Sequence, residues 1–272
     1  WSSDVCSSDL LNPALLVLVF SNSFINFRRC IHNKILEDSL KTLFITSLCL
    51  ILNVSHLMGG DVSGKISFDG KAPKMKALKI AADPVCVANN TSAPTKEWLI
   101  VDANGGVKNV LVYISEGVSA SKEAPTNHVV IDQKGCVYTP HVIGVQVGQP
   151  LDILNNDGTL HNIHALPKLN REFNKAMPKF KKKMTTQFDK AEDPFKIKCD
   201  VHPWMGAYIG VFDHPYFVVS GNDGSYTISG LNPGTYTITA WHEKLKTKTI
   251  TVKVGDGSTT ADFTFSKPQK KK

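Results

Sequence analysis

Short alternations of apolar and polar residues, broken by turn residues, run along the chain from Asp61 onward. A two-residue period of this kind is typical of half-buried β-strands. The segments predicted as strands are 62–68, 98–101, 107–114, 128–131, 143–147, 151–155, 162–166, 183–188, 195–199, 207–212, 216–220, 225–228, 234–241 and 248–254. Residues 169–176 fit a short helical turn or a loop equally well. The pattern predicts an all-β protein built of sandwiches.

The first 58 residues do not share this pattern. Residues 1–10 resemble the translation of a sequencing adapter, so they are left out of the fold prediction. Residues 42–54 form an apolar run preceded by Lys34 and Lys41. The run is short for a membrane span of about 20 residues, and its length suits a secretory signal segment. We therefore expect an exported protein, periplasmic or extracellular, with an uncleaved membrane-anchoring leader as the alternative.

The chain carries a formal net charge of +7. After residue 58 its positive charge is nearly all lysine, with Arg171 as the one arginine. Recognition of bases and phosphates usually recruits arginine, so no nucleic-acid partner is expected. The lysine-rich runs 179–183 and 270–272, the latter in a basic tail at 267–272, are either solvated or attract an acidic partner or a membrane surface.

One short segment concentrates candidate metal ligands. Cys199, His202 and Met205 lie within seven residues, and His161 follows a polar turn upstream. A thiolate, two imidazoles and a weakly bound thioether are the ligand set of a blue-copper electron-transfer site. Zinc is the weaker alternative because methionine binds zinc poorly. The spacing predicts one type-1 copper per chain.

These motifs resemble those of the cupredoxins, most closely the amicyanin-like members. The resemblance covers about 136–212 and rests on the compact Cys-x-x-His-x-x-Met loop and on the run His161-Asn162-Ile163-His164. Leu154 stands where the family commonly has an aromatic residue. The resemblance implies a Greek-key sandwich in which His161, Cys199 and His202 form the copper plane and Met205 is the axial ligand.

The resemblance also implies roles for neighbouring residues. Asn162 is expected to tie the two ligand loops together by hydrogen bonds, and Pro203 to stiffen the short loop. In cupredoxins the imidazole that corresponds to His202 has an edge at the surface, within an apolar patch that serves as the electron port. Pro203 and Trp204 would help to build that patch here.

The remaining histidines and methionines are interpreted as packing or surface residues. His164 is predicted to point away from His161 on its strand. His141 could approach a metal from a neighbouring loop, but a structural role is favoured. His214 and His242 are interpreted in the same way. Met177 and Met184 are interpreted as unspecialised methionines of a lysine-rich loop, with a copper-trafficking role as the alternative.

Three cysteines follow the leader, and an odd number in an oxidising compartment needs an explanation. We expect metal to hold Cys199 as thiolate while Cys86 and Cys136 form a disulfide. Three free, buried cysteines are the alternative.

The C-terminal pattern resembles another family. An Asp-Gly turn at 223–224 and the run Pro233-Gly234-Thr235-Tyr236 resemble the carboxypeptidase-regulatory-like, transthyretin-like sandwich. Residues 62–68 and 107–113 fit its opening strands, on the far side of the copper motifs. We expect 59–118 and 214–266 to form one discontinuous sandwich, with the cupredoxin domain 119–213 inserted in it; a tandem order is the alternative.

Two functions fit these motifs. The first is a non-enzymatic, exported electron carrier that shuttles single electrons between redox proteins, one of them with an acidic docking face. The second is a copper-binding or copper-delivery protein, or a cell-envelope interaction module with a structural copper site.

Overall fold

The computed structural model describes residues 59–121 and 123–267, and their regular secondary structure is almost entirely β-strand. A 3-10 turn, η1 (Ile80–Ala82), and one short helix, α2 (Pro84–Ala88), interrupt the strands. The all-β sandwich prediction is confirmed. The predicted leader at 42–54 lies outside the described residues. Within the described part, no helix is long and apolar enough to cross a membrane.

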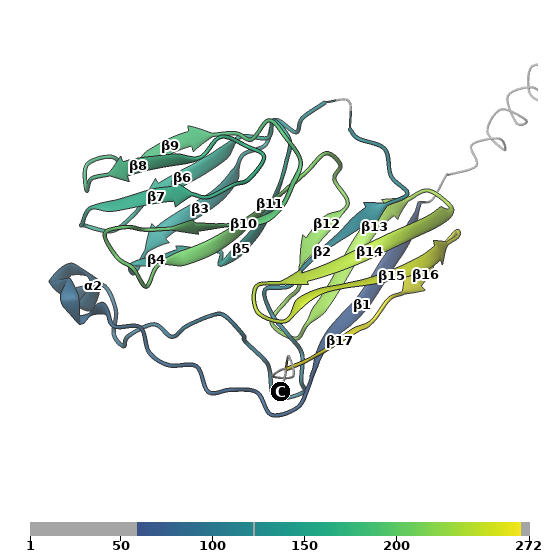
Figure 1. Cartoon of the computed structure of the whole chain (residues 1–272), viewed down its shortest axis with the longest axis horizontal. Helices are drawn as coiled ribbons and strands as arrows, with labels where there is room; N and C mark the ends of the chain where they lie inside the picture. Colours follow the sequence, from purple (N-terminus) through teal and green to yellow (C-terminus); the bar gives the residue numbers. More distant parts are fainter. Residues whose placement is uncertain (1–58, 122, 268–272) are drawn as a thin grey trace, which may run out of the picture. The chain divides into compact units, whose positions relative to one another are not determined.

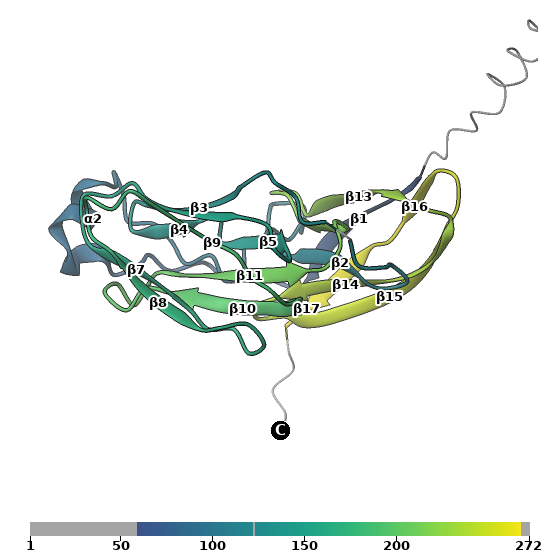
Figure 2. The same cartoon turned by 90° about the horizontal axis from the view of Figure 1, so that it is seen from above.

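Two sheets form the sandwich that carries the copper motifs, and they are seen as two layers in Figure 2. The first sheet has the order β5 (Val142–Gln146), β11 (Gly206–Phe212), β10 (Glu192–Lys198), β7 (His161–Ala165), β8 (Phe173–Met177). The second has the order β4 (Val137–Thr139), β3 (Val129–Lys134), β6 (Leu151–Asn155), β9 (Lys183–Thr186). Alternate residues of both sheets face inward, as Ile131, Ile153, Ile163, Ile197 and Ile209 do.

Residues 169–176 were predicted as a helical turn or a loop; 169–172 are loop, and the rest is neither. Residues Phe173–Met177 form β8, which pairs antiparallel with β7 from His161↔Met177 to Ala165↔Phe173. Met177 is fully buried in the core, although most of the strand is exposed. An edge strand with only Phe173 and Met177 packed against the core carries too little apolar alternation to be recognised from sequence.

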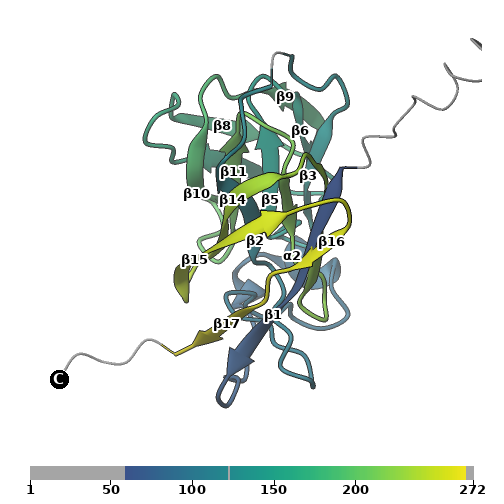
Figure 3. The ribbon, with the colours of Figure 1, turned by 90° about the vertical axis from the view of Figure 1, so that its right-hand side faces the viewer.

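Two further sheets form a second sandwich from both ends of the described chain (Figure 1). One contains β13 (Ser225–Leu231), β1 (Gly60–Asp69), β16 (Ser258–Thr260) and β17 (Phe263–Ser266). The other has the order β12 (Phe217–Val219), β2 (Leu111–Glu116), β14 (Gly234–His242), β15 (Lys246–Val254). Figure 3 shows β1 running beside β16 and β17, with which it pairs in parallel.

Strand pairing explains why this second core draws on distant residues. β1 pairs with β13 and β2 pairs with β14, so residues near 62–68 and 111–116 lie beside residues 225–241. One hydrophobic core contains Val62, Ile66, Val112, Ile228 and Ile238. The pairing supports our proposal that the other sandwich is inserted in this one, although the proposed boundaries stay a prediction.

The segment 77–96 does not fit the expectation that all of 59–118 belongs to the discontinuous sandwich. Leu78, Ile80 and Cys86 pack in the core of the copper-motif sandwich. A disulfide joins Cys86 to Cys136, between β3 and β4, with a Cα–Cα distance of 5.6 Å. The predicted pairing is therefore confirmed. In Figure 1, α2 (blue) lies at the end of the sandwich where β4 and β7 are found.

Candidate metal centre

Two neighbouring strands bring the predicted ligands together. His161 is the first residue of β7, and Cys199 directly follows β10. These strands pair through Ile197↔Ala165 and Lys198↔His164, which places the Cys199–Met205 loop beside His161. Backbone hydrogen bonds close that loop, from Cys199 N–H to the Met205 carbonyl (3.3 Å) and from Met205 N–H to the His202 carbonyl (2.9 Å).

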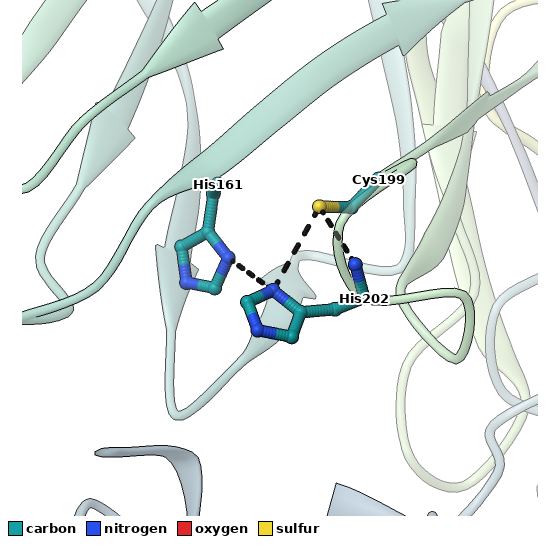
Figure 4. A group of neighbouring side chains, drawn as sticks. All are labelled: His161, Cys199 and His202. Atoms are coloured by element: carbon teal, nitrogen blue, oxygen red, sulfur yellow. Dashed lines mark hydrogen bonds between the residues drawn. The ribbon is translucent and has the colours of Figure 1, made fainter. Parts of the chain in front are cut away.

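Three donor atoms converge inside the sandwich (Figure 4). The Nδ1 atoms of His161 and His202 are 2.9 Å apart, and the Cys199 Sγ lies 3.9 Å from the His202 Nδ1. All three side chains are buried, and one donor atom from each lies within 4.8 Å of the others. Strand pairing and the loop therefore hold the three atoms around one point.

Each imidazole has a carboxylate on its other nitrogen. The His161 Nε2 lies 2.8 Å from the Asp157 Oδ2, and the His202 Nε2 lies 3.0 Å from the Asp83 Oδ2. Donation of both Nε2–H groups to carboxylates leaves both Nδ1 lone pairs directed at the common point. Two lone pairs 2.9 Å apart repel unless a cation lies between them. A proton or a metal ion satisfies this requirement.

The pKa directions agree with that geometry. Burial lowers the pKa of His161, but hydrogen bonds to Asp157 and Cys199 outweigh it and raise the pKa to about 9. Burial raises the pKa of the Cys199 thiol, but the His161 hydrogen bond and backbone N–H donors lower it overall. One of these donors is the His202 N–H, 3.3 Å from the sulfur. The lowered pKa makes the thiol easier to convert to the thiolate, which is the form that binds metal.

The β3–β4 turn fixes Asp157. Gly135 and Cys136 both have positive φ, 66° and 57°, as a two-residue hairpin turn of this hand requires. Their backbone N–H groups donate to the two carboxylate oxygens of Asp157, each at 2.8 Å. The carboxylate is thereby aimed at His161. We did not identify Asp157 from sequence, although its position four residues before His161 in a polar turn is a usable signal.

Asn162 links the two ligand loops. Its Oδ1 accepts hydrogen bonds from the Cys199 thiol (3.2 Å) and from the N–H groups of Asp200 (2.7 Å) and Val201 (3.3 Å). These contacts are the ones expected of a residue that ties the loops together. Its functional role stays a prediction.

The remaining residues of the loop differ in exposure. Met205 is buried at the end of the loop, and Pro203 is exposed. Trp204 is half-buried and packs against His202 with ring centroids 5.0 Å apart. The assignment of Met205 as axial ligand stays a prediction.

The exposed edge expected for His202 is not found. Its side chain is buried because Asp83 and Cys86 cover it, with the Cys86 Sγ 3.8 Å from the Nε2. Asp83 caps α2 by accepting from the Val85 N–H at 2.8 Å and also accepts from the Thr159 hydroxyl at 3.0 Å. The sequence offered only the Asp-Pro start of a short helix, which does not reveal this contact.

The other histidines of the described residues lie outside the ligand cluster. His164 bonds to Asp200 and Glu172, and His141 lies 2.6 Å from a Glu243 oxygen. His214 and His242 are buried and bonded to backbone groups. Two more groups of potential metal ligands in the described residues contain Cys86 or Cys136, which the disulfide removes as ligands.

The donor set fits copper. Two imidazole nitrogens and one thiolate sulfur suit both oxidation states of copper, whereas a hard cation would require oxygen ligands. Met205 lies in the same loop and would add a soft, weak donor. His161, Cys199 and His202 are therefore the residues that would hold the ion.

Residues 202–266 match the family model of the carboxypeptidase regulatory-like domain, a match that begins inside the ligand loop. Comparison with curated protein sequences gives no match.

Several solved structures that are similar to part of this chain are cupredoxins or contain them. A Cu-containing nitrite reductase from Thermus scotoductus SA-01 is 18% identical over 38% of this chain and 25% of its own length, with a TM-score of 0.29. A Cu(I) amicyanin variant is 21% identical over 37% of this chain and 97% of its own, with a TM-score of 0.28. A purple cupredoxin from Nitrosopumilus maritimus is 20% identical over 30% of this chain and 97% of its own, with a TM-score of 0.26.

Proposed function

We propose that this protein is an exported type-1 copper protein that carries single electrons between redox partners. The observation that supports this most directly is the buried convergence of two histidine Nδ1 atoms and the Cys199 sulfur. The Cys86–Cys136 disulfide supports export, because disulfides persist in oxidising compartments.

The chain's own residues prepare the site. Asp157 and Asp83 fix the tautomers of His161 and His202, and Asn162 holds the backbone beside Cys199. When bound, copper would supply a Cu(I)/Cu(II) couple. Because these partners are in place around the donor atoms, the protein needs little rearrangement when the charge at the site changes.

A structural or stored copper is the second candidate. It is favoured by the burial of His202, which lacks the exposed edge of a usual electron port. A reversible voltammetric wave distinguishes the two functions, since a carrier exchanges electrons without losing metal. Its absence would favour the structural role.

The test is the visible and electron-paramagnetic-resonance spectrum of the purified protein after one equivalent of Cu(II). An electron carrier of this type gives intense thiolate-to-copper absorption and a narrow copper hyperfine splitting. Cys199→Ser should remove the colour and leave the β-sandwich circular-dichroism spectrum unchanged. His164→Gln, on the same strand as His161, is the matched control and should stay coloured. A pale wild-type protein or a coloured Cys199→Ser variant contradicts the proposal.

A further inference from the structure

The covered edge of His202 raises the question of how electrons reach the site. Its Nε2 contacts Asp83 at 3.0 Å, and the disulfide sulfur of Cys86 lies 3.8 Å away. The side chain is only 2% exposed. A redox partner that approaches this edge therefore meets the Asp83–Cys86 segment instead of the imidazole.

Trp204 offers another route out of the site. Its ring packs against that of His202, with centroids 5.0 Å apart and planes inclined by 49°. Its Nε1–H donates to the Cys136 carbonyl at 3.1 Å, which fixes the orientation of the indole. The indole is half-buried, so one part touches a predicted ligand while another reaches the surface.

The surface that Trp204 reaches is an open groove with a volume of about 840 Å³. Pro203, Trp204, Met205 and Gly206 of the ligand loop line it. The groove thus extends along the predicted copper ligand loop. Tyr208 and Trp98 add partly exposed aromatic surface, and aromatic side chains are enriched at protein–protein contacts.

Lysines border this groove. The exposed lysines that line it are Lys76, Lys79, Lys96, Lys196 and Lys244. Only two acidic residues, Glu97 and Glu243, line it as well. The Glu243 carboxylate contacts His141 at 2.6 Å and accepts from the Tyr208 hydroxyl at 3.2 Å, so it is already partnered. The excess of positive charge selects an acidic surface as the complement.

We propose that an acidic redox protein docks in the groove bordered by Lys79 and Lys196 and exchanges electrons with the copper site through Trp204. The inference rests on the proposed electron-carrier function and adds the entry point and the charge of the partner. Each exchange moves one electron: Cu(I) at the site becomes Cu(II) while the one-electron acceptor of the partner is reduced, or the reverse.

The first experiment locates anion binding without using electron transfer. Hexacyanochromate(III) is added to the Cu(I) protein, and paramagnetic broadening of backbone amide and indole NMR signals is recorded. We expect broadening at Trp204, Tyr208 and Lys196. Selective broadening around Lys179–Lys183 or around Asp83 and Val87 would overturn the proposal.

The second experiment measures the rate at which an acidic and a basic cytochrome c oxidise the reduced protein, at several salt concentrations. We expect a faster reaction with the acidic cytochrome that slows as salt rises. A Lys79→Glu/Lys196→Glu variant should slow it on the order of tenfold or more. Lys253→Glu, an exposed lysine on β15, is the matched control and should leave the rate nearly unchanged.

Variants of the loop test the route itself. Trp204→Leu should slow the reaction with both cytochromes, and Trp204→Phe should restore most of the rate because an aromatic ring again bridges His202 and the groove. Val201→Glu changes the exposed part of the same loop and tests whether electrons leave there instead of through the groove. A rate that responds to Val201→Glu and not to the groove lysines overturns the inference. A wild type without a blue copper spectrum contradicts the proposed function itself. Altered rates in a blue wild type and its variants test only the docking groove and the route through Trp204.

Discussion

His202 donates its Nε2–H to Asp83, a residue 119 positions earlier in the chain, across 3.0 Å. Asp83 caps the short helix α2, and the Cys86–Cys136 disulfide anchors that helix. The contact therefore links an anchored helix to a predicted copper ligand. It gives both histidines of the cluster a carboxylate partner, since Asp157 holds His161 in the same way. A carboxylate on a ligand histidine fixes its tautomer and strengthens it as a donor.

Replacement of Asp83 with Asn is expected to raise the reduction potential of the copper site. The amide oxygen can still accept from His202, but the negative charge that favours Cu(II) is lost. We expect a rise on the order of 60 mV, which corresponds to about a tenfold change in the relative affinity for the two oxidation states. Protein-film voltammetry measures it. Asp256→Asn, in an exposed turn, is the control, and equal potentials in the two variants would contradict the role given to Asp83.

Loss of the disulfide is expected to lower stability and uncover His202. The bond closes a 50-residue loop, for which the chain-entropy estimate gives about 4 kcal/mol. The Cys86→Ser/Cys136→Ser variant should therefore unfold at lower denaturant concentration. It should also bind added imidazole at the copper site, seen as a change in the visible spectrum. The Cys199→Ser protein retains the disulfide and controls for the loss of a sulfur atom; mass spectrometry of unreduced peptides checks the pairing.

Removal of the Asn162 side chain is expected to weaken the copper site more than the fold. Asn162→Ala leaves the N–H groups of Asp200 and Val201 without their acceptor, at a cost of about 1–3 kcal/mol. Because the loop then loses its link to β7, copper affinity should fall roughly 10-fold to 100-fold. Competition with a Cu(I) chelator measures the affinity. Asn156→Ala removes a bond to Asp132 at an exposed position; an equal loss of affinity there would argue against a specific role for Asn162.

His242 is expected to make the protein less stable in mild acid. It is buried, and its Nδ1 accepts from the N–H groups of Lys244 and Leu245 at 3.1 Å. Burial lowers its pKa from 6.5 to about 4, with His141 and Lys244 acting in the same direction and Glu243 opposing. The unfolded chain therefore binds the proton more tightly. The contribution of neutral His242 to the free energy of unfolding is complete above pH 6.5. It is lost as the pH falls toward 4, and the loss reaches about 3 kcal/mol.

Denaturant unfolding between pH 7.5 and 4.5 tests this contribution. His242→Asn keeps an acceptor for the same backbone N–H groups but does not titrate, so its free energy of unfolding should fall less in this range. Carboxylates contribute equally to the pH dependence of unfolding in both proteins. The difference between the two curves therefore reports the titration of His242. Parallel curves for the two proteins would show that His242 is not the responsible group.

Most strands that alternate regularly could be predicted from sequence. The exceptions are β17, which alternates but was not predicted, and residues 98–101, which were predicted as a strand but form only an isolated bridge at Val101. Residues 151–155 were predicted as a strand with the bounds that β6 has. The strands β8 and β16 were missed because each has few inward-facing apolar residues. Their structure depends on the neighbours they pair with, β7 and β1.

The sequence alone determined the all-β fold, the two sandwich patterns, the Cys199–Met205 loop and the pairing of Cys86 with Cys136. These depend on short-range periodicity, on close ligand spacing and on counting cysteines. Only the tertiary structure placed Asp83 and Asp157 behind the two histidines, covered His202 and opened the groove beside Trp204. Such contacts join residues up to 119 positions apart. They form because burial of one core brings distant segments together, and no local pattern records which polar groups then meet.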